Sequence, residues 1–292
     1  MTHYRLTRVD TTVIAALRCN PVDPTVSNSQ QIAVAVIPAR YDSTRLPGKP
    51  LLLLGGKPLV LWVAERALAA RTISRVIVAT DDERILRAVE AAGFEAMMTR
   101  ADHTSGSDRV AEVARGLDAE IIVNVQGDEP LIEPDTIDRA VNALIEDGEA
   151  MMATTSEPID TAADVLSRSV VKVIVDDAGR ALSFSRNPIP FPKQAARQHG
   201  SIEAALRNEP ALLFSFRKHT GLYVYRREFL LEFAGWPQTA TEKAESLEQL
   251  RALEHGVTIK VVEATAPSIG VDTKEDLERV RAMMEGKMEV IA

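Results

Sequence analysis

In the first half of the chain, short apolar runs alternate with longer amphipathic segments. Residues 32–38 (IAVAVIP) and 75–80 (RVIVAT) are short, almost continuous apolar runs, and a third strand is expected within residues 119–130. Such runs are typical of strands covered on both faces. Amphipathic helices are predicted for residues 58–70, 81–93, 106–117 and 134–148. This alternation predicts an α/β fold, a mostly parallel twisted sheet with helices on both faces.

The pattern changes after about residue 150. Residues 170–186 predict two strands joined by a turn that contains Asp177 and Gly179. They are followed by a strand at 221–226, a helix at 242–256, a strand at 258–264 and a helix at 272–286. Thr273 is the expected N-cap of the last helix, with Asp276 three positions later. A smaller, mixed or antiparallel portion is therefore expected here.

Residues 1–31 stand apart from both patterns. They are polar and contain prolines after position 18, without helical or strand periodicity, so we expect a disordered N-terminal arm. Residues 32–292 are expected to form a single domain. Its parts are a nucleotide-sized α/β half at about 32–150, a more antiparallel portion at about 151–265, and a C-terminal loop and helix at about 266–286.

Composition excludes several classes of protein. Charged residues make up 26% and hydrophobic residues 46% of the 292, and the net charge of -8 argues against a general nucleic-acid binder. Cys19 is the only cysteine, so no intramolecular disulfide framework is expected. No stretch approaches the roughly 18–20 apolar residues that cross a bilayer. A cytoplasmic protein with no membrane partner is the expectation.

The loop after the first strand concentrates positive charge. Arg40, Arg45 and Lys49 lie within ten positions, opposed only by Asp42. Lys49 is followed by proline rather than Ser or Thr, so this is not a Walker A loop, and no G-x-G-x-x-G motif follows the first strand. Guanidinium and ammonium groups at the carboxyl end of a parallel strand predict a phosphate site. A solvated surface loop is the alternative.

Two aspartates are candidates for holding a metal ion. Asp128 lies in a turn that ends the strand at 119–130, and Asp272 stands just before the last helix. Carboxylates facing an anion loop are suitable ligands for Mg²⁺ carried on phosphates. The alternatives are a plain Asx-type turn at Asp128 and favourable helix N-terminal charge at Asp272.

A late polar set offers contacts for a small ligand. Arg186 is a candidate for binding a carboxylate, and the others are candidates for sugar hydroxyls: His219, Tyr223, Glu248 and Gln249. Each also has an ordinary structural explanation as a loop cation, a core histidine, a half-buried tyrosine or a helix surface group.

These motifs together resemble the bacterial 3-deoxy-manno-octulosonate (Kdo) cytidylyltransferases. IPARYDSTRLPGKPL, VATDDE, TRADHTSGSDRVAEV, VNVQGDEPLI, FSRNPIP, HTGLYVYR, ESLEQLR and GVDTKEDLERV occur in the family's order over about residues 32–286. The resemblance implies a nucleotidyltransferase (Rossmann-like) fold. It also implies a CTP-binding half, a sugar-binding and dimerisation portion, and a C-terminal metal-site loop and helix.

The resemblance implies a role for each matching residue. Arg40, Arg45 and Lys49 would hold the CTP phosphates, with Arg45 also close to the sugar acid, and Arg109 would lie at the cytosine. Asp128 and Asp272 would hold Mg²⁺. The implied Kdo contacts are Gln126, Arg186, His219, Tyr223, Glu248 and Gln249.

Three departures from the family pattern affect no charged or metal-binding group. Ser183 replaces a common aromatic residue, Thr241 replaces a usual Leu, and SRSVVKV lacks a frequent Asn-Pro. They bear on packing or sugar preference more than on activity. The arm at 1–31 has no counterpart in the family.

The implied reaction converts CTP and Kdo into CMP-Kdo and pyrophosphate, the step that activates Kdo for lipopolysaccharide synthesis. The implied cofactor is Mg²⁺, and the implied assembly is a homodimer. One alternative is a related acid sugar as substrate, such as 8-amino-Kdo or a sialic acid. Another is a non-catalytic nucleotide-binding regulator, which would be expected to lack Asp128, Asp272 or Lys49. A structural protein is the third.

Overall fold

The computed structural model describes residues 32–42, 45–267 and 269–286. The prediction of an N-terminal arm at residues 1–31 falls outside these residues. Within the described chain, no helix is long and apolar enough to span a membrane.

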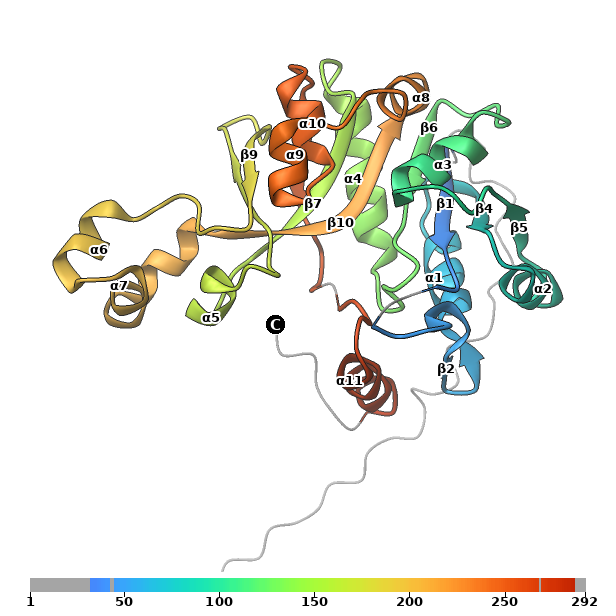
Figure 1. The fold of residues 1–292 in the computed structure, drawn as a ribbon, viewed down its shortest axis with the longest axis horizontal. Helices are drawn as coiled ribbons and strands as arrows, with labels where there is room; N and C mark the ends of the chain where they lie inside the picture. The colour runs from blue at the N-terminus through green and yellow to red at the C-terminus, as the bar shows by residue number, and fades with distance from the viewer. Residues whose placement is uncertain (1–31, 43–44, 268, 287–292) are drawn as a thin grey trace, which may run out of the picture. The chain divides into compact units, whose positions relative to one another are not determined.

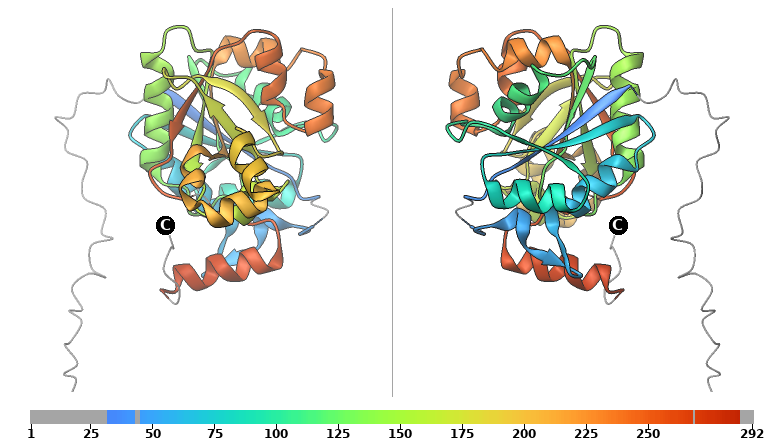
Figure 2. Two further views of the ribbon diagram at one scale, coloured as in Figure 1. Left: turned by 90° about the vertical axis from the view of Figure 1, so that its left-hand side faces the viewer. Right: turned by 90° about the vertical axis from the view of Figure 1, so that its right-hand side faces the viewer.

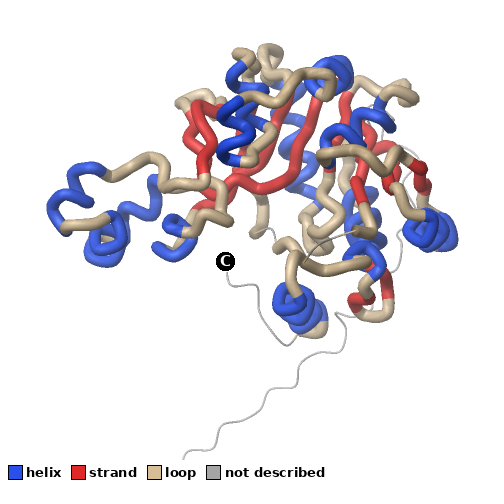
Figure 3. Tube along the Cα trace, viewed as in Figure 1, coloured by secondary structure: helices blue, strands red, loops and turns tan. Residues whose placement is uncertain are grey.

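One sheet organises the described part of the chain, with nine strands there (Figures 1 and 3). Seven of them follow the order β11-β7-β10-β6-β1-β4-β5. Their bounds are β1 (Ala33–Ala39), β4 (Ile73–Thr80), β5 (Glu95–Met98), β6 (Ile121–Asn124), β7 (Met152–Pro158), β10 (Arg217–Arg226) and β11 (Ile259–Glu263). Strand β1 pairs parallel with β4 and β6, whereas β10 is antiparallel to β6 and β7. The predicted mostly parallel sheet is confirmed.

The antiparallel addition is also confirmed. Strands β8 (Lys172–Val175) and β9 (Ala181–Ser185) form the predicted antiparallel pair, and β8 joins the main sheet through β10. A short separate hairpin, β2 (Leu53–Leu54) and β3 (Lys57–Pro58), follows the 3-10 helix η2 (Lys49–Leu51).

Helices cover both faces of the main sheet, as the apolar runs predict. Helices α1 (Leu59–Leu68), α2 (Glu83–Ala91), α4 (Pro134–Glu146) and α11 (Lys274–Met284) contribute buried residues to one core cluster. Helices α3 (Gly106–Ala114), α8 (Arg227–Phe233) and α10 (Gln249–Glu254) contribute to the other. Strand β1 serves both clusters, with Ala35 and Ile37 in the first and Val34 and Val36 in the second. Burial on alternate faces explains why this strand is apolar throughout.

The single helix predicted for residues 242–256 is wrong. Two helices occupy this region, α9 (Ala240–Glu245) and α10, and the chain turns at Ser246 with a left-handed φ of 53°. Helix α9 begins with a capping box between Thr239 and Glu242. The break lets Leu247 and Leu250 pack into the core beside α3 and α8.

A segment outside the main sheet carries the chain from β9 to β10. It contains α6 (Lys193–His199), α7 (Ile202–Asn208) and η3 (Pro210–Ser215), and Figure 1 shows α6 and α7 standing away from the sheet. With α5 (Ala162–Leu166), it buries a small cluster of Ile159, Val165, Leu206 and Phe216. We call residues 191–215 the projecting segment.

Helix α11 packs beside the β2–β3 hairpin, as both views of Figure 2 show. Leu277 and Val280 are buried in the first core cluster, and Arg281 donates a hydrogen bond to the Leu53 carbonyl oxygen at 2.9 Å. Thr273 caps the helix and forms the predicted capping box with Asp276. These contacts fix the position of the loop that precedes α11.

Candidate active site

A pocket of about 390 Å³ opens at the carboxyl edge of the parallel strands. Ligands of open α/β sheets bind at this edge. The walls come from the loops after β1, β5 and β6, from the start of α10 and from the loop before α11. The pocket is lined by eight of the residues singled out in the sequence: Arg40, Arg45, Lys49, Arg109, Gln126, Asp128, Glu248 and Asp272.

The cationic loop after β1 is held in a compact turn. Gly48 has a left-handed φ of 68°, and its N–H donates a hydrogen bond to the Tyr41 carbonyl oxygen at 3.0 Å. The guanidinium of Arg84, from α2, lies 3.4 Å above the Tyr41 ring. Arg40 is exposed and has no ion-pair partner within the described residues, so its guanidinium is available to an anion.

The two predicted carboxylates meet at one ammonium group. Lys49 Nζ lies 2.6 Å from Asp128 Oδ2 and 3.1 Å from Asp272 Oδ1. Arg45 lies 3.0 Å from the other oxygen of Asp272. The backbone N–H of Val271 donates to the Asp128 carbonyl oxygen at 2.9 Å, so the main chain also holds the two loops together.

The carboxylate pair has the chemistry that a magnesium ion requires. Asp128 and Asp272 direct hard oxygen atoms at a common cation, which is here the ammonium group of Lys49. No group of three or more His, Cys, Asp or Glu side chains suited to a metal occurs among the described residues. Mg²⁺ is commonly held by one or two carboxylates together with substrate phosphates, so the pair fits a nucleotide-borne ion.

A glycine allows the β6 loop to approach the end of β1. A Cβ atom at Gly127 would lie 2.8 Å from the Pro38 carbonyl oxygen, closer than real contacts allow. Because Gly127 has no Cβ atom, the β6 loop can place Asp128 beside the cationic loop.

We expect Gly127→Ala to lower the free energy of unfolding by about 1–3 kcal/mol, because the backbone of β1 or β6 must move. Urea denaturation measures this change. Gly148→Ala is the matched control, since a Cβ there meets no atom within 4 Å, and it should change stability by less than about 0.5 kcal/mol. Equal stabilities of the two variants would show that the loop tolerates the extra atom.

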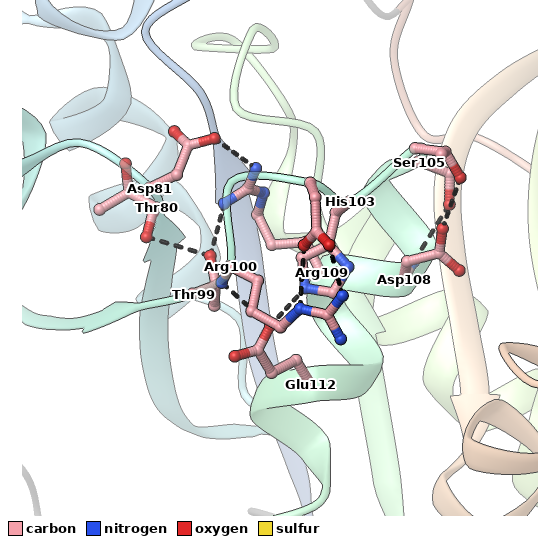
Figure 4. A network of polar contacts seen from close by, with 11 residues as sticks. Thr80, Asp81, Thr99, Arg100, His103, Ser105, Asp108, Arg109 and Glu112 are labelled. Carbon is pink, nitrogen blue, oxygen red and sulfur yellow. Dashed lines mark hydrogen bonds and ion pairs between the residues drawn. The ribbon is translucent and has the colours of Figure 1, made fainter.

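Arg109 joins the ends of three elements on the far wall of the pocket (Figure 4). It is 4% exposed on α3 and donates to Thr99, after β5, and to Asp81, after β4, at 2.7 Å. These contacts occupy part of the guanidinium that the resemblance assigns to the cytosine. The structure shows Arg109 lining the pocket and bracing the wall at the same time.

The predicted sugar contacts divide into three groups. Gln126 and Glu248 line the pocket. Tyr223 donates to Gln249 Oε1 at 3.2 Å, and its ring contacts that of His219, with centroids 5.5 Å apart. These three residues lie on β10 and α10 and are not among the residues that line the pocket.

Arg186 is placed differently. Its guanidinium donates to the carbonyl oxygens of Glu245, Ser246 and Arg168. It is therefore bound to the turn between α9 and α10 and does not line the pocket described above. Its assignment to a sugar carboxylate stays a prediction.

Burial changes the acid–base properties of this region. Removal from water raises the pKa of Glu248, while the Ser105 and Ser107 hydroxyls and Arg251 partly offset the shift. Burial also raises the pKa of Tyr223, so its hydroxyl stays protonated and can donate. The region beside Gln126 is thus a desolvated, hydrogen-bonding wall.

His219 predicts a measurable dependence of stability on pH. Burial lowers its pKa to about 3, whereas an unfolded chain has a value near 6.5. Below pH 6.5 the unfolded chain takes up a proton that the native protein does not, so native stability falls as the pH decreases. Between pH 6 and 4, His219 should add up to about 1.4 kcal/mol per pH unit to the slope of the free energy of unfolding against pH. We expect His219→Asn to lack this contribution. Urea denaturation across this range measures it, and parallel curves for the two proteins would contradict it.

Four consecutive pocket residues are among those to which the sequence assigns no role: His103, Thr104, Ser105 and Gly106. Ser105 caps α3, and His103 contacts Glu112 of the same helix. A Ser at a helix start followed by Asp108 indicates an N-cap, and a helix that follows a parallel strand begins at the carboxyl edge of the sheet. Asp81, the partner of Arg109, could have been sought because it directly follows a parallel strand.

The sheet, its cationic loop and its paired carboxylates define a nucleotidyltransferase of the α/β class. The family described as cytidylyltransferase matches residues 34–259. A 4-diphosphocytidyl-2C-methyl-D-erythritol synthase structure from Anaerococcus prevotii shares the fold, with a TM-score of 0.55 at 14% identity over 88% of this chain and 97% of its own.

Relatives of higher sequence identity show which family within this class the chain belongs to. The 3-deoxy-manno-octulosonate cytidylyltransferase of Trichlorobacter lovleyi is 50% identical over 86% of this chain and 98% of its own length. That of Geotalea uraniireducens is 54% identical over 84% and 96%. A solved structure of CMP:2-keto-3-deoxy-manno-octonic acid synthetase complexed with CTP has a TM-score of 0.78 and 43% identity, covering 88% of this chain and 100% of its own. The chain belongs to the 3-deoxy-manno-octulosonate cytidylyltransferase family.

Proposed function

We propose that this chain transfers CMP from CTP to Kdo and releases pyrophosphate. The observation that carries the proposal is the meeting of Arg40, Arg45 and Lys49 with the Asp128–Asp272 pair in one pocket at the carboxyl edge. The oxygen of the sugar's anomeric hydroxyl attacks the α-phosphorus in line. The bond from that phosphorus to the bridging oxygen breaks, pyrophosphate leaves, and the hydroxyl proton passes to solvent.

The three cations of the loop solve an electrostatic problem. Kdo carries a carboxylate and must approach a triphosphate of the same sign. At about 4 Å, two like unit charges repel by on the order of 4 kcal/mol at an effective dielectric constant near 20. Arg40, Arg45 and Lys49 offset this repulsion by binding phosphate oxygens. The loop therefore positions the reactants and stabilises the charge that develops on the leaving pyrophosphate.

Mg²⁺ is the proposed cofactor, held by Asp128 and Asp272 together with phosphate oxygens. When bound, it would supply charge neutralisation and make the attacking hydroxyl more acidic. The remaining contributions belong to the chain itself. Arg109 and Asp81 hold the far wall rigid, and the buried wall around Glu248 excludes water from the reacting groups.

The sugar acid is proposed to bind beside Gln126 and Glu248, with Tyr223, Gln249, His219 and Arg186 supporting that side. A related acid sugar such as 8-amino-Kdo is the second candidate, because a buried carboxylate such as Glu248 suits an amino group as well as a hydroxyl.

Pyrophosphate release tests the reaction directly. CTP and Mg²⁺ are supplied with Kdo, with 8-amino-Kdo, or without sugar. We expect release with Kdo at the higher kcat/KM and only background without sugar. A preference for the amino sugar would transfer the assignment to the second candidate. No release with either sugar would overturn the proposed function.

We further propose that the enzyme works in the cytoplasm, where its nucleotide substrate is found, and that it forms a homodimer through the projecting segment. Phe214 is 90% exposed and Phe191 is 58% exposed on this segment. Aromatic side chains with so much exposed apolar surface are typical of interfaces.

We expect Phe214→Asp to convert the dimer into a monomer, because a carboxylate would replace the apolar contact at the interface. Light scattering coupled to size-exclusion chromatography measures the molar mass, which should fall by half. Leu53→Asp, at an exposed leucine of the β2–β3 hairpin, is the control and should leave the mass unchanged. A Phe214→Asp protein with the wild-type mass would exclude this interface.

A further inference from the structure

The ammonium group of Lys49 occupies the point where the two candidate metal ligands converge. It contacts Asp128 at 2.6 Å and Asp272 at 3.1 Å, and its side chain is only 15% exposed. Arg45 contacts the second oxygen of Asp272 at 3.0 Å. Two unit positive charges therefore balance two carboxylates in the chain without ligands.

The backbone keeps the carboxylates together independently of Lys49. The hydrogen bond from Val271 N–H to the Asp128 carbonyl oxygen joins their loops, and Asp276 accepts from the N–H of both Asp272 and Thr273. Removal of Lys49 would consequently leave Asp128 uncompensated beside Asp272, whose remaining partner is the exposed Arg45, and would raise the affinity of the pair for a cation.

In the proposed reaction, the ammonium group of Lys49 binds two kinds of anion, the Asp128–Asp272 carboxylates and the phosphate oxygens. It lines the same pocket as Arg40, whose guanidinium has no ion-pair partner within the described residues, but its own ammonium is already engaged by carboxylates. A flexible four-carbon stem allows the ammonium to move between partners. A divalent ion carries the same charge as the two cations that it would replace.

We propose that Lys49 and Arg45 exchange with the metal ion during substrate binding. Both cations leave the Asp128–Asp272 pair for the phosphate oxygens as the nucleotide and its divalent ion arrive together. This inference rests on the proposed function. It predicts that a metal ion alone binds weakly, because it must displace two cations that have no anion to receive them. Nucleotide and metal binding are therefore positively coupled.

Mn²⁺ alone, measured by the loss of its free electron paramagnetic resonance signal, is the probe of this exchange. We expect Lys49→Met to bind Mn²⁺ at least about tenfold more tightly than the wild type in the absence of nucleotide, because no ammonium group competes. Lys49→Arg keeps a cation and should bind as weakly as the wild type. Lys57→Met removes a lysine from an unrelated ion pair with Glu65 and should also leave the affinity unchanged.

Two further measurements locate the effect and guard against misfolding. The double variant Lys49→Met/Asp128→Asn should lose the additional Mn²⁺ affinity, and Mn²⁺ should raise the Tm of Lys49→Met more than that of the wild type. If Lys49→Met does not fold, Lys49→Gln takes its place. Unchanged or weaker Mn²⁺ binding by the folded variant would overturn the exchange.

The outcome is separable from the proposed reaction. A wild-type enzyme that releases pyrophosphate, combined with unchanged Mn²⁺ affinity in Lys49→Met, would leave the function standing and remove the exchange. Tighter Mn²⁺ binding by Lys49→Met, combined with no pyrophosphate release by the wild type, would support the exchange and remove the function.

Discussion

Asp128→Asn should lower kcat by about 10²–10³-fold, the loss expected when one preorganised electrostatic group is removed from a reacting centre. The substitution preserves the size of the side chain. It also leaves the backbone carbonyl oxygen of residue 128, which accepts from the Val271 N–H, so the loop keeps its position. It removes one negative charge from the pair that contacts Lys49. Steady-state pyrophosphate release with CTP and Kdo measures the change.

The control for this prediction is Asp177→Asn, in the exposed turn between β8 and β9. The chemical change is the same, but Asp177 does not line the pocket, so this variant should retain the wild-type kcat. An Asp128→Asn enzyme within twofold of the wild type would show that the carboxylate is not needed for turnover.

Arg109→Met is expected to lower the free energy of unfolding by about 3 kcal/mol, because it leaves the Asp81 carboxylate without its partner on a poorly solvated wall. For a protein of this size the corresponding decrease in Tm is roughly 6–12 °C. The ends of β4, β5 and α3 would lose their common contact, so KM for CTP should rise as well. Urea denaturation and initial rates measure the two effects.

A double-mutant cycle isolates the ion pair from the loss of packing. Asp81→Asn combined with Arg109→Met should recover part of the stability, since no unpaired carboxylate then remains. Arg87→Met removes an exposed helical ion pair with Glu83 and should cost less than about 0.5 kcal/mol. Equal losses for Arg87→Met and Arg109→Met would contradict the bracing role of Arg109.

The predictable part of the fold is the part whose apolar spacing follows directly from burial. Strands β1 and β4 and helices α1 to α4 fall within about three residues of the predicted ranges because each has a buried face made of aliphatic side chains. Strand β7 has no counterpart among the predicted elements, for the opposite reason. Its buried Thr154 and Thr155 hydroxyls bond to β10, a partner that exists only after the sheet has formed.

The candidate site shows the same division. Position after a parallel strand was enough to place the cationic loop and Asp128 at the carboxyl edge. Asp272 could be linked to them only by the family resemblance, because 144 residues separate the aspartates in the sequence and a single backbone hydrogen bond joins their loops. Asp81 stands out in the sequence because it directly follows a parallel strand, but its pairing with Arg109 could not be predicted, since Arg109 lies on a helix 28 residues later and only the fold brings the two side chains together.

The position of Asp272 depends on the packing of α11, the last helix of the described chain. Asp272 belongs to the segment that α11 anchors, and that anchorage includes the buried Leu277 and Val280, the partly buried Met284 and the hydrogen bond from Arg281 to Leu53. A helix with only two buried side chains opens more often than the sheet does. We expect opening of α11 to release Asp272 from Lys49, so a weakened helix would appear in an assay as fewer working enzymes rather than slower ones.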